Sequence, residues 1–175
     1  MTDKKIWFIT GAGRGMGIAL TKGARLEVAV QKLTELGVER ILPFTAVRSV
    51  VRWDADGARR RLRRLQRVAR EASMQSRRLH LPQVEPVTDF AAVASLPGAA
   101  MTEPGGVPPS LEHAILLIGP EGGWAPEELG QRLARVRLGP HVLRAETAAM
   151  AAGALLVGLR NRVVGPVRHP DGGGD

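Results

Sequence analysis

The chain of 175 residues contains no cysteine and no tyrosine. Without cysteine it has no disulfide, no thiolate nucleophile and no cysteine-ligated zinc. The histidines are too few and too scattered to show the spacing of a metal site, so we expect no metal; they are His80, His113, His141 and His169. No apolar run is long enough to cross a bilayer, and the first residues lack the apolar stretch of a signal peptide. We therefore expect no membrane partner and a cytoplasmic location.

The positive charge of the chain is unevenly placed. The formal net charge is +8, while hydrophobic residues make up 44% and charged residues 24%, as in ordinary globular domains. Nine arginines gather in one stretch: Arg59, Arg60, Arg61, Arg63, Arg64, Arg67, Arg70, Arg77 and Arg78. Such a cluster attracts polyanions, and arginine can bind phosphate through two hydrogen bonds. A solvated helix face accounts for the charge equally well, so composition permits nucleic-acid binding without showing it.

The apolar periodicity predicts an α/β domain with a parallel sheet. Residues 5–10 form an apolar run typical of a buried strand, and residues 26–33 carry apolar side chains at helical spacing. Gly37 stands where a helix C-cap glycine is expected, and residues 38–44 again favour a strand. This strand–helix–strand order is the elementary unit of a parallel α/β sheet.

The rest of the chain continues the alternation of helices and strands. Residues 58–79 predict an amphipathic, strongly basic helix that Pro82 ends. Residues 98–110 are rich in proline and glycine and predict a mobile loop, whereas residues 113–119 form the clearest buried strand. The other expected elements are a short helix at 89–94, a helix at 127–135, a short strand at 136–138, a helix from Thr147 as N-cap to about 160, and a disordered tail from 165.

Two loops have the composition of a ligand site. Residues 118–124 (IGPEGGW) directly follow the clearest strand, and residues 138–147 (LGPHVLRAET) run from a strand end to a helix start. Ligands of open α/β sheets bind at the carboxyl ends of strands, where glycines allow close backbone approach. A helix N-terminus also favours a nearby anionic group. Taken singly, each Gly-Pro pair indicates only a tight turn; together the loops could hold a small cofactor.

The two loops together resemble the paired signature of the RsmE-type SPOUT RNA methyltransferases. Further segments match that family in order: Lys22–Glu27, Gln31–Val38, Arg48–Val50 and Glu71–Arg78 with Leu81-Pro82. The resemblance covers residues 22–164. It implies an α/β fold with a SPOUT-type parallel sheet, helices on both faces and a C-terminal trefoil knot. It also implies a homodimer that uses S-adenosyl-L-methionine to methylate uracil N3 of small-subunit ribosomal RNA.

The same resemblance assigns roles to individual residues. The implied cofactor-binding residues are Leu96, Ile118, Gly119, Pro120, Gly122, Gly123, Leu138, Gly139, Leu143 and Thr147. The implied RNA-binding residues are Arg48, Gln75, Arg77 and Arg78. Arg144 could stabilise charge on the uracil oxygens, and Glu146 or Glu121 could take the N3 proton or orient the base. Alternatively, Arg144 and Glu146 only brace the knot or the dimer.

The N-terminus resembles a different family. Thr10–Gly17 (TGAGRGMG) fits the glycine loop of short-chain dehydrogenases, which approaches a dinucleotide pyrophosphate. Catalysis in that family needs a Tyr-x-x-x-Lys pair, so the absence of tyrosine excludes an active dehydrogenase. We expect residues 1–21 to replace the PUA-like barrel of the RsmE-type family, followed by the SPOUT domain at 22–164 and a tail at 165–175. Two alternatives remain open: a partial SPOUT domain that binds cofactor or RNA without turnover, and a dinucleotide-binding oxidoreductase fragment.

Overall fold

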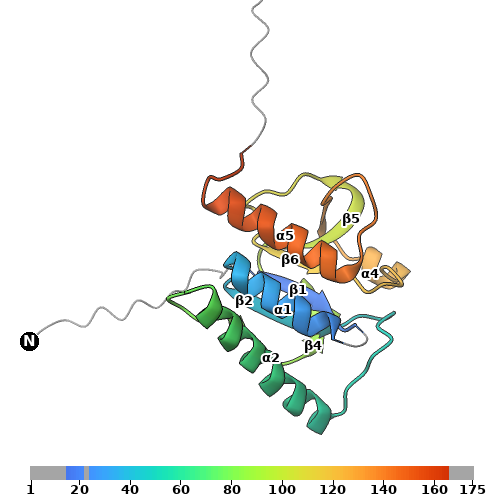
Figure 1. The fold of residues 1–175 in the computed structure, drawn as a ribbon. Coiled ribbons are helices and arrows are strands. Elements are labelled where there is room, and N and C mark those ends of the chain that lie inside the picture. Colours follow the sequence, from blue (N-terminus) through green and yellow to red (C-terminus); the bar gives the residue numbers. More distant parts are fainter. Residues whose placement is uncertain (1–14, 22–23, 166–175) are drawn as a thin grey trace, which may run out of the picture.

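A parallel sheet forms the centre of the computed structural model, which describes residues 15–21 and 24–165 (Figure 1). Its strands are β1 Gly15–Ala19, β2 Arg40–Thr45, β3 Gln83–Val84, β4 Thr88–Asp89, β5 Ala99–Val107, β6 Ile115–Ile118 and β7 Ala134–Val136. Along the sheet the order is β3-β2-β1-β6-β5-β7, with β4 also pairing with β2. All of these pairs are parallel, which confirms the predicted sheet.

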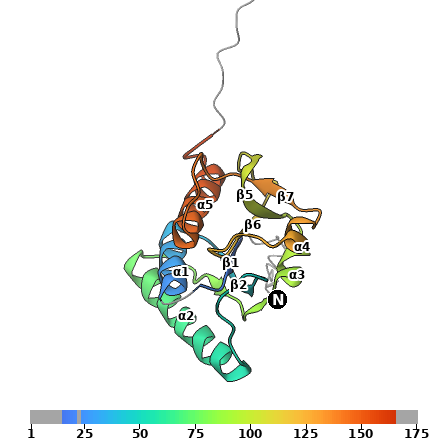
Figure 2. The same ribbon diagram turned by 90° about the vertical axis from the view of Figure 1, so that its right-hand side faces the viewer.

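Helices cover both faces of the sheet, as the family resemblance implied. They are α1 Arg25–Leu36, α2 Ala55–Gln75, α3 Phe90–Ala94, α4 Pro126–Leu129 and α5 Ala145–Arg160. Helices α1, α2 and α5 lie on one face, and the short helices α3 and α4 lie on the other (Figure 2). None of the helices within these described ranges is long and apolar enough to span a membrane.

The two faces bury different side chains. Under α1, α2 and α5 the core is aliphatic, with Met16, Leu33 and Leu116 among its fully buried members. On the opposite face the core is aromatic, because Phe44, Phe90 and Trp124 pack together. Successive residues of a strand point to opposite faces, so Leu116 and Leu117 of β6 enter different cores.

The first described strand corrects the prediction of a glycine loop. Gly15 and Gly17 lie in β1, between β2 and β6, and not in a turn that approaches a ligand. A Cβ atom on Gly17 would lie 2.5 Å from Cδ2 of Leu117, so the glycine here allows a neighbouring side chain to pack over the strand. The sheet therefore includes residues before Lys22. The predicted strand at 5–10 and residues 10–14 of the glycine motif lie outside the described residues, as does the tail from 166.

Helices α1 and α2 form close to where the periodicity placed them. Helix α1 ends at Gly37, which has the predicted left-handed conformation with φ of 96°. Helix α2 begins three residues earlier than predicted, because Asp54 acts as N-cap and its Oδ1 accepts a hydrogen bond from Gly57 N at 2.6 Å. It ends at Gln75, well before Pro82, so the proline does not terminate it.

The proline- and glycine-rich segment 98–110 is a strand over most of its length, so the predicted loop is wrong. Ala100 and Met101 are fully buried where β5 pairs with β6 and β7. A Cβ on Gly106 would lie 2.5 Å from the carbonyl of Arg135, so glycine permits close approach of two backbones here. The local composition gave a turn signal, while sheet pairing with distant residues decided the conformation.

The C-terminal elements are present with shifted ends. Helix α4 starts at Pro126 in the predicted first-turn position but is only four residues long. Helix α5 starts at Ala145 with Arg144 as its N-cap, so the prediction of Thr147 as N-cap is wrong. Gly153 of α5 packs closely on α1, since a Cβ there would lie 2.6 Å from Leu33 Cδ2.

Candidate functional site

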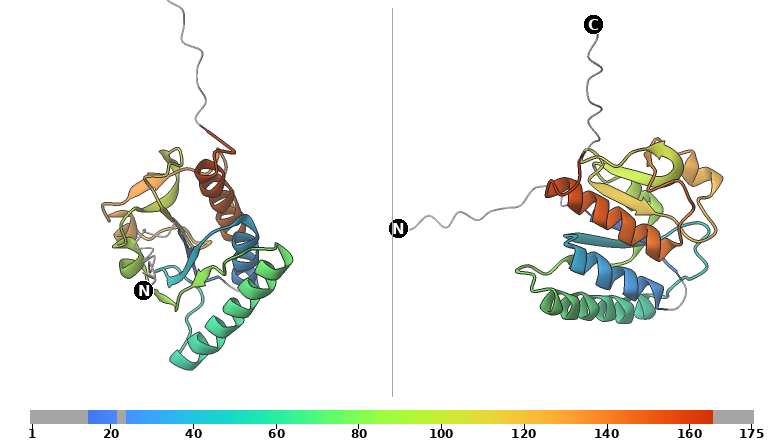
Figure 3. Two further views of the ribbon diagram at one scale, coloured as in Figure 1. Left: turned by 90° about the vertical axis from the view of Figure 1, so that its left-hand side faces the viewer. Right: turned by 45° about the horizontal axis from the view of Figure 1, so that its top comes forward.

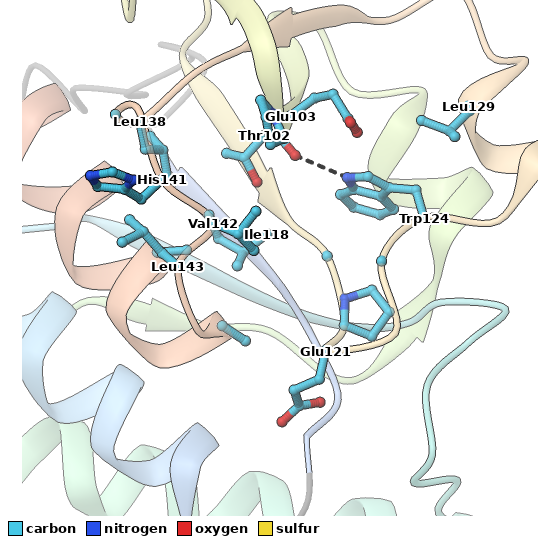
Figure 4. A pocket seen from close by; sticks show the side chains of 17 residues that line it. Thr102, Glu103, Ile118, Glu121, Trp124, Leu129, Leu138, His141, Val142 and Leu143 are labelled. Carbon is cyan, nitrogen blue, oxygen red and sulfur yellow. Dashed lines mark hydrogen bonds between the residues drawn. The ribbon is translucent and has the colours of Figure 1, made fainter.

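A pocket of about 380 Å³ lies beside the carboxyl ends of β6 and β7 and the middle of β5 (Figure 4). It is lined by Thr102, Glu103, Pro104, Ile118, Gly119, Pro120, Glu121, Gly123, Trp124, Leu129, Leu138, Gly139, His141, Val142, Leu143, Ala145 and Ala148. Both loops singled out in the sequence contribute to it. The pocket therefore occupies the edge of the sheet where open α/β folds bind ligands.

Trp124 forms one wall of this pocket. Its indole stacks on Phe44 with ring centroids 6.2 Å apart and planes 4° from parallel, and its Nε1 donates a hydrogen bond to Thr102 O at 3.0 Å. Gly119 lies directly beneath the ring, because a Cβ at that position would be 2.9 Å from Trp124 Cε2. Glycine at 119 is thus required by the close approach of the loop backbone to the indole.

The loop after β2 braces the loop after β6 from outside. Arg48 Nη1 donates to Gly122 O at 3.0 Å. The buried carboxylate of Glu128 accepts from Val47 N at 2.9 Å and from Ala125 N at 2.8 Å. Both oxygens of this carboxylate are therefore satisfied by backbone donors on two different segments. These hydrogen bonds hold the pocket wall against a part of the chain about eighty residues away in sequence.

The second loop and α5 form the opposite wall. Leu138 and Leu143 are half-buried and pack against the aliphatic core, whereas Val142 between them is 86% exposed. Ala145 and Ala148 of α5 present small side chains to the pocket. The N-terminus of α5 lies at this wall, and its backbone N–H groups favour a polar or anionic group.

Seven of the ten expected cofactor-binding residues line the pocket: Ile118, Gly119, Pro120, Gly123, Leu138, Gly139 and Leu143. Three do not. Gly122 is exposed on the outer side of its loop beside Arg48, and Thr147 is exposed on α5. Leu96 packs at the margin of the aromatic core.

The three expected catalytic residues occupy different surroundings. Glu121 lines the pocket and forms an ion pair with Arg25 at the start of α1. Arg144 is exposed at the N-cap of α5 and does not line the pocket. Glu146 does not line it either; its Oε2 is buried and has no hydrogen-bond partner among the described residues. Of the three, the structure brings only Glu121 to the pocket wall.

The expected RNA-binding residues are likewise not equivalent. Gln75 and Arg77 are exposed at the end of α2. Arg78 is instead used within the fold, since its Nη1 donates to Thr34 O at 2.8 Å and to Val38 O at 2.9 Å at the end of α1. Burial lowers the pKa of the Arg78 guanidinium below its ordinary value. Arg48 braces the pocket loop, as described above.

Sequence reasoning missed the β5 part of the pocket. Thr102, Glu103 and Pro104 line it, but they fell in the segment predicted as a loop. Thr102 is held there by its Oγ1, which donates to Leu117 O at 2.9 Å. Trp124 had one available signal, because it directly follows the glycines of the first loop. Nothing in the local sequence indicated that β5 would lie beside it.

The fold and the pocket define a parallel α/β domain with a pocket of small-ligand size between loops at the carboxyl edge of its sheet. Over residues 15–157 the chain matches the family described as RNA methyltransferase domain. The chain belongs to this family of RNA methyltransferase domains, which confirms the resemblance found in the sequence.

Two curated relatives and two solved structures are similar over most of the chain. Ribosomal RNA small subunit methyltransferase E of Mycobacterium tuberculosis is 37% identical over 153 residues, which cover 77% of this chain and 58% of the relative. The Bacillus subtilis protein of the same name is 33% identical over 156 residues, covering 76% and 60%. The chain therefore spans about three fifths of the length of these relatives.

Both solved structures contain S-adenosyl methionine. The Neisseria gonorrhoeae ribosomal RNA small subunit methyltransferase E bound to that cofactor superposes with a TM-score of 0.70 at 30% identity, covering 80% of this chain and 63% of the other. A Legionella pneumophila methyltransferase with the same bound cofactor gives a TM-score of 0.72 at 28% identity, covering 81% and 64%.

Proposed function

We propose that the protein is an S-adenosyl-L-methionine-dependent methyltransferase that acts on uracil N3 of small-subunit ribosomal RNA. One observation carries the proposal: the two loops that resemble the family's cofactor signature meet around a single pocket at the carboxyl edge of the sheet. Membership of the RNA methyltransferase family and the cofactor-bound relatives support it.

The residues of the pocket fit this cofactor. Its volume of about 380 Å³ lies within the range of small-ligand sites, about 300–1,000 Å³. Ile118, Leu138 and Leu143 give apolar walls for a ring system, while Gly119 and Gly139 leave the backbone accessible for polar groups. We assign cofactor binding to these five residues, with Trp124 as a supporting wall.

The bound cofactor supplies a methyl group on a positively charged sulfonium. The protein has to place uracil N3 in line with that methyl group and remove the N3 proton, and orientation can supply much of the rate. Glu121 on the pocket wall, held by Arg25, is one candidate to accept the proton or orient the base; Glu146 is the other. Arg144 would stabilise negative charge on the uracil oxygens.

We further propose a homodimer and a trefoil-knotted C-terminal segment, as in the family. The outer side of the pocket supports the dimer, because the 86% exposed Val142 would gain a partner there. Light scattering tests the dimer by measuring the molecular mass of the protein in solution. A monomer at micromolar concentration would contradict the dimer without affecting the cofactor assignment.

One observation favours a second candidate, a domain that binds cofactor or RNA without turnover. Neither Arg144 nor Glu146 lines the pocket, so only one of the three candidate catalytic residues is in place within this chain. The dehydrogenase-like alternative has no such support, because Gly15 and Gly17 lie in a strand of the sheet.

Calorimetric titration with S-adenosylhomocysteine, with NAD(H) and NADP(H) as parallel ligands, tests the cofactor assignment. We expect saturable binding of S-adenosylhomocysteine alone. Gly119→Ala should abolish it, because the added Cβ meets the Trp124 ring, whereas Gly130→Ala meets only ordinary contacts outside the pocket and should bind normally. Binding of a dinucleotide alone would overturn the proposal.

Methylation assays then separate the two candidates. Small ribosomal subunits lacking the modification are incubated with methyl-labelled cofactor, and the labelled nucleotide is identified by mass spectrometry. Labelled methyl at uracil N3 supports the proposal that the protein is a methyltransferase. Cofactor binding without any transfer supports the binding-only alternative. If transfer occurs, loss of turnover with retained cofactor binding in Glu121→Gln or Glu146→Gln would show which carboxylate acts in the transfer step.

A further inference from the structure

Helix α2 carries a straight row of solvent-facing arginines. Arg60, Arg63, Arg67 and Arg70 are all exposed. Their spacing of three, four and three residues places them on one face of the helix. The buried side chains of α2, which include Leu65, Ala69 and Ala72, lie on the opposite face. We call these four residues the arginine row.

Of the other three arginines of the helix, Arg59 is exposed and pairs with Asp56 of the same helix, whereas Arg61 and Arg64 are held by the fold. Arg61 and Arg64 both approach Oε1 of Glu27, a buried carboxylate of α1, at 3.2 Å. Arg61 also lies over the ring of Trp53, 5.6 Å from its centroid. These two guanidinium groups therefore fasten α2 to α1 and are not free to bind another charged molecule without loss of that contact.

The arginine row has little compensating charge. Helix α2 contains seven arginines and two acids, Asp56 and Glu71, so it alone supplies a surplus of five positive charges to a chain with a net charge of +8. Within the row, only Arg67 has an ion pair among the described residues, a distant one with Glu71 at 3.9 Å in which both side chains are about 70% exposed. Such a pair contributes little.

The row begins at the same edge of the sheet as the pocket, although α2 packs beside β3 and the pocket is built from the other end of the sheet. Each helix between parallel strands returns in the opposite direction, so α2 begins at the carboxyl edge of the sheet (Figures 1 and 3). The pocket lies at the same edge. Arg60 is the member closest to this edge, and Arg70 lies about 15 Å further along the helix axis at 1.5 Å per residue. The segment between β2 and α2 adds exposed Arg52 and joins the pocket loop through Arg48.

We propose that the arginine row binds phosphates of the RNA substrate along α2, starting from the edge of the sheet that also holds the pocket. This inference rests on the proposed function and names a part of its substrate site. A row of arginines with little neighbouring negative charge complements a polyanion whose charges repeat along its length. A bilayer is disfavoured as the partner because the apolar face of α2 is buried against α1 and the sheet.

The test compares two double variants with equal loss of charge. Arg60→Gln with Arg63→Gln removes two unpaired members of the row, and Arg132→Gln with Arg162→Gln removes two exposed arginines elsewhere. Fluorescence anisotropy measures binding to transcribed small-subunit ribosomal RNA from low to moderate salt. For the row variant we expect at least about tenfold weaker binding and a salt slope smaller by about 1.4, at about 0.7 for each single-stranded phosphate contact. The second variant should change both quantities much less.

Each outcome decides for or against the row. Equal weakening in both variants would show dependence on net charge alone and overturn the proposal, as would unchanged binding in the row variant. Loss of binding to phosphatidylserine vesicles with RNA binding intact would assign the face to a membrane instead. S-adenosylhomocysteine affinity should be the same in all variants; if the wild-type chain fails to bind it, the proposed function fails while the RNA result still tests the row.

Discussion

The half of the sheet built from β5, β6 and β7 and the half built from β1, β2 and β3 offer different surfaces to a ligand. The first half forms a pocket with mainly apolar walls, in which Gly119 approaches Trp124 so closely that no side chain fits between them. The second half supports α2, whose outward face is a row of exposed arginines. One surface is shaped by close packing and the other by charge.

This difference has a consequence for how each surface responds to change. A packed pocket depends on the position of every wall, because interiors transmit strain and tolerate little added volume. In a row of solvated charges, one residue can be substituted without disturbing the others, since exposed charges interact weakly with one another and with the fold. Substitutions in the pocket half should therefore affect stability and binding together, and substitutions in the arginine row should affect binding alone.

The largest effect is expected for Trp124→Ala. The substitution removes a buried ring, its stacking on Phe44 and its hydrogen bond to Thr102 O. Large-to-small changes of this kind cost about 3–5 kcal/mol of unfolding free energy. Chemical denaturation and S-adenosylhomocysteine titration should show loss of both stability and binding.

Trp53→Ala is the matched control, since Trp53 lies between β2 and α2, away from the pocket half of the sheet. Trp53 is only partly buried and packs at the margin of the aliphatic core under Arg61. We expect a smaller loss of stability and unchanged affinity for S-adenosylhomocysteine. Equal loss of cofactor affinity in both variants would show that the pocket responds to global destabilisation and that Trp124 has no special role in its wall.

The next effect in size is expected for Glu128→Gln. An amide has one carbonyl oxygen, so it cannot accept the hydrogen bonds of both Val47 N and Ala125 N as the carboxylate does. Leaving a buried donor unsatisfied costs about 1–3 kcal/mol. Glu127→Gln, at the exposed neighbouring position, should change the free energy of unfolding little. Thermal and chemical denaturation measure the stability of both variants. If Glu127→Gln lost as much stability as Glu128→Gln, the bracing role of Glu128 would be contradicted.

Arg78→Gln tests the part of the basic half that belongs to the fold. Its guanidinium is partly buried and donates to two carbonyls at the end of α1, so its loss should cost about 1.5 kcal/mol of unfolding free energy, the lower end of the range for charged hydrogen bonds. RNA affinity should fall no more than for one exposed charge. Stability equal to that of the wild type would show that Arg78 is free and restore it as a candidate for phosphate contact.

Much of the fold follows from local patterns in the sequence. The helical spacing of Leu26, Ala29, Val30 and Leu33 and the C-cap at Gly37 are local properties, and they placed α1 correctly. The glycines of residues 118–124 likewise located the pocket, because close backbone approach needs glycine whatever the ligand. Strand β5 was missed, since its prolines and glycines give a turn signal and only pairing with β6 and β7 makes it a strand.

The roles of the arginines were beyond local patterns for a related reason. The partners of Arg61 and Arg78 lie 34 and at least 40 residues away in sequence, on α1 or at its end. Arginines of α2 and of the turn that follows it therefore divide into bound and exposed groups only after the helices pack. The knot and the dimer are implied only by the family resemblance, and they stay predictions.

The smallest effect on stability is expected for Arg63→Gln, a single member of the arginine row. Arg63 is exposed and has no ion pair among the described residues, and glutamine has nearly the same helix propensity, so the free energy of unfolding should change by less than about 0.5 kcal/mol. RNA affinity of the variant should nevertheless fall measurably at low salt. As salt is raised it should converge with that of the wild type, because salt weakens the phosphate contact that the wild type makes and the variant lacks. Denaturation and anisotropy on the same preparation check both parts. A loss of stability comparable to that of Arg78→Gln would mean that Arg63 supports the fold, and the division between a packed half and a charged half would then fail at this helix.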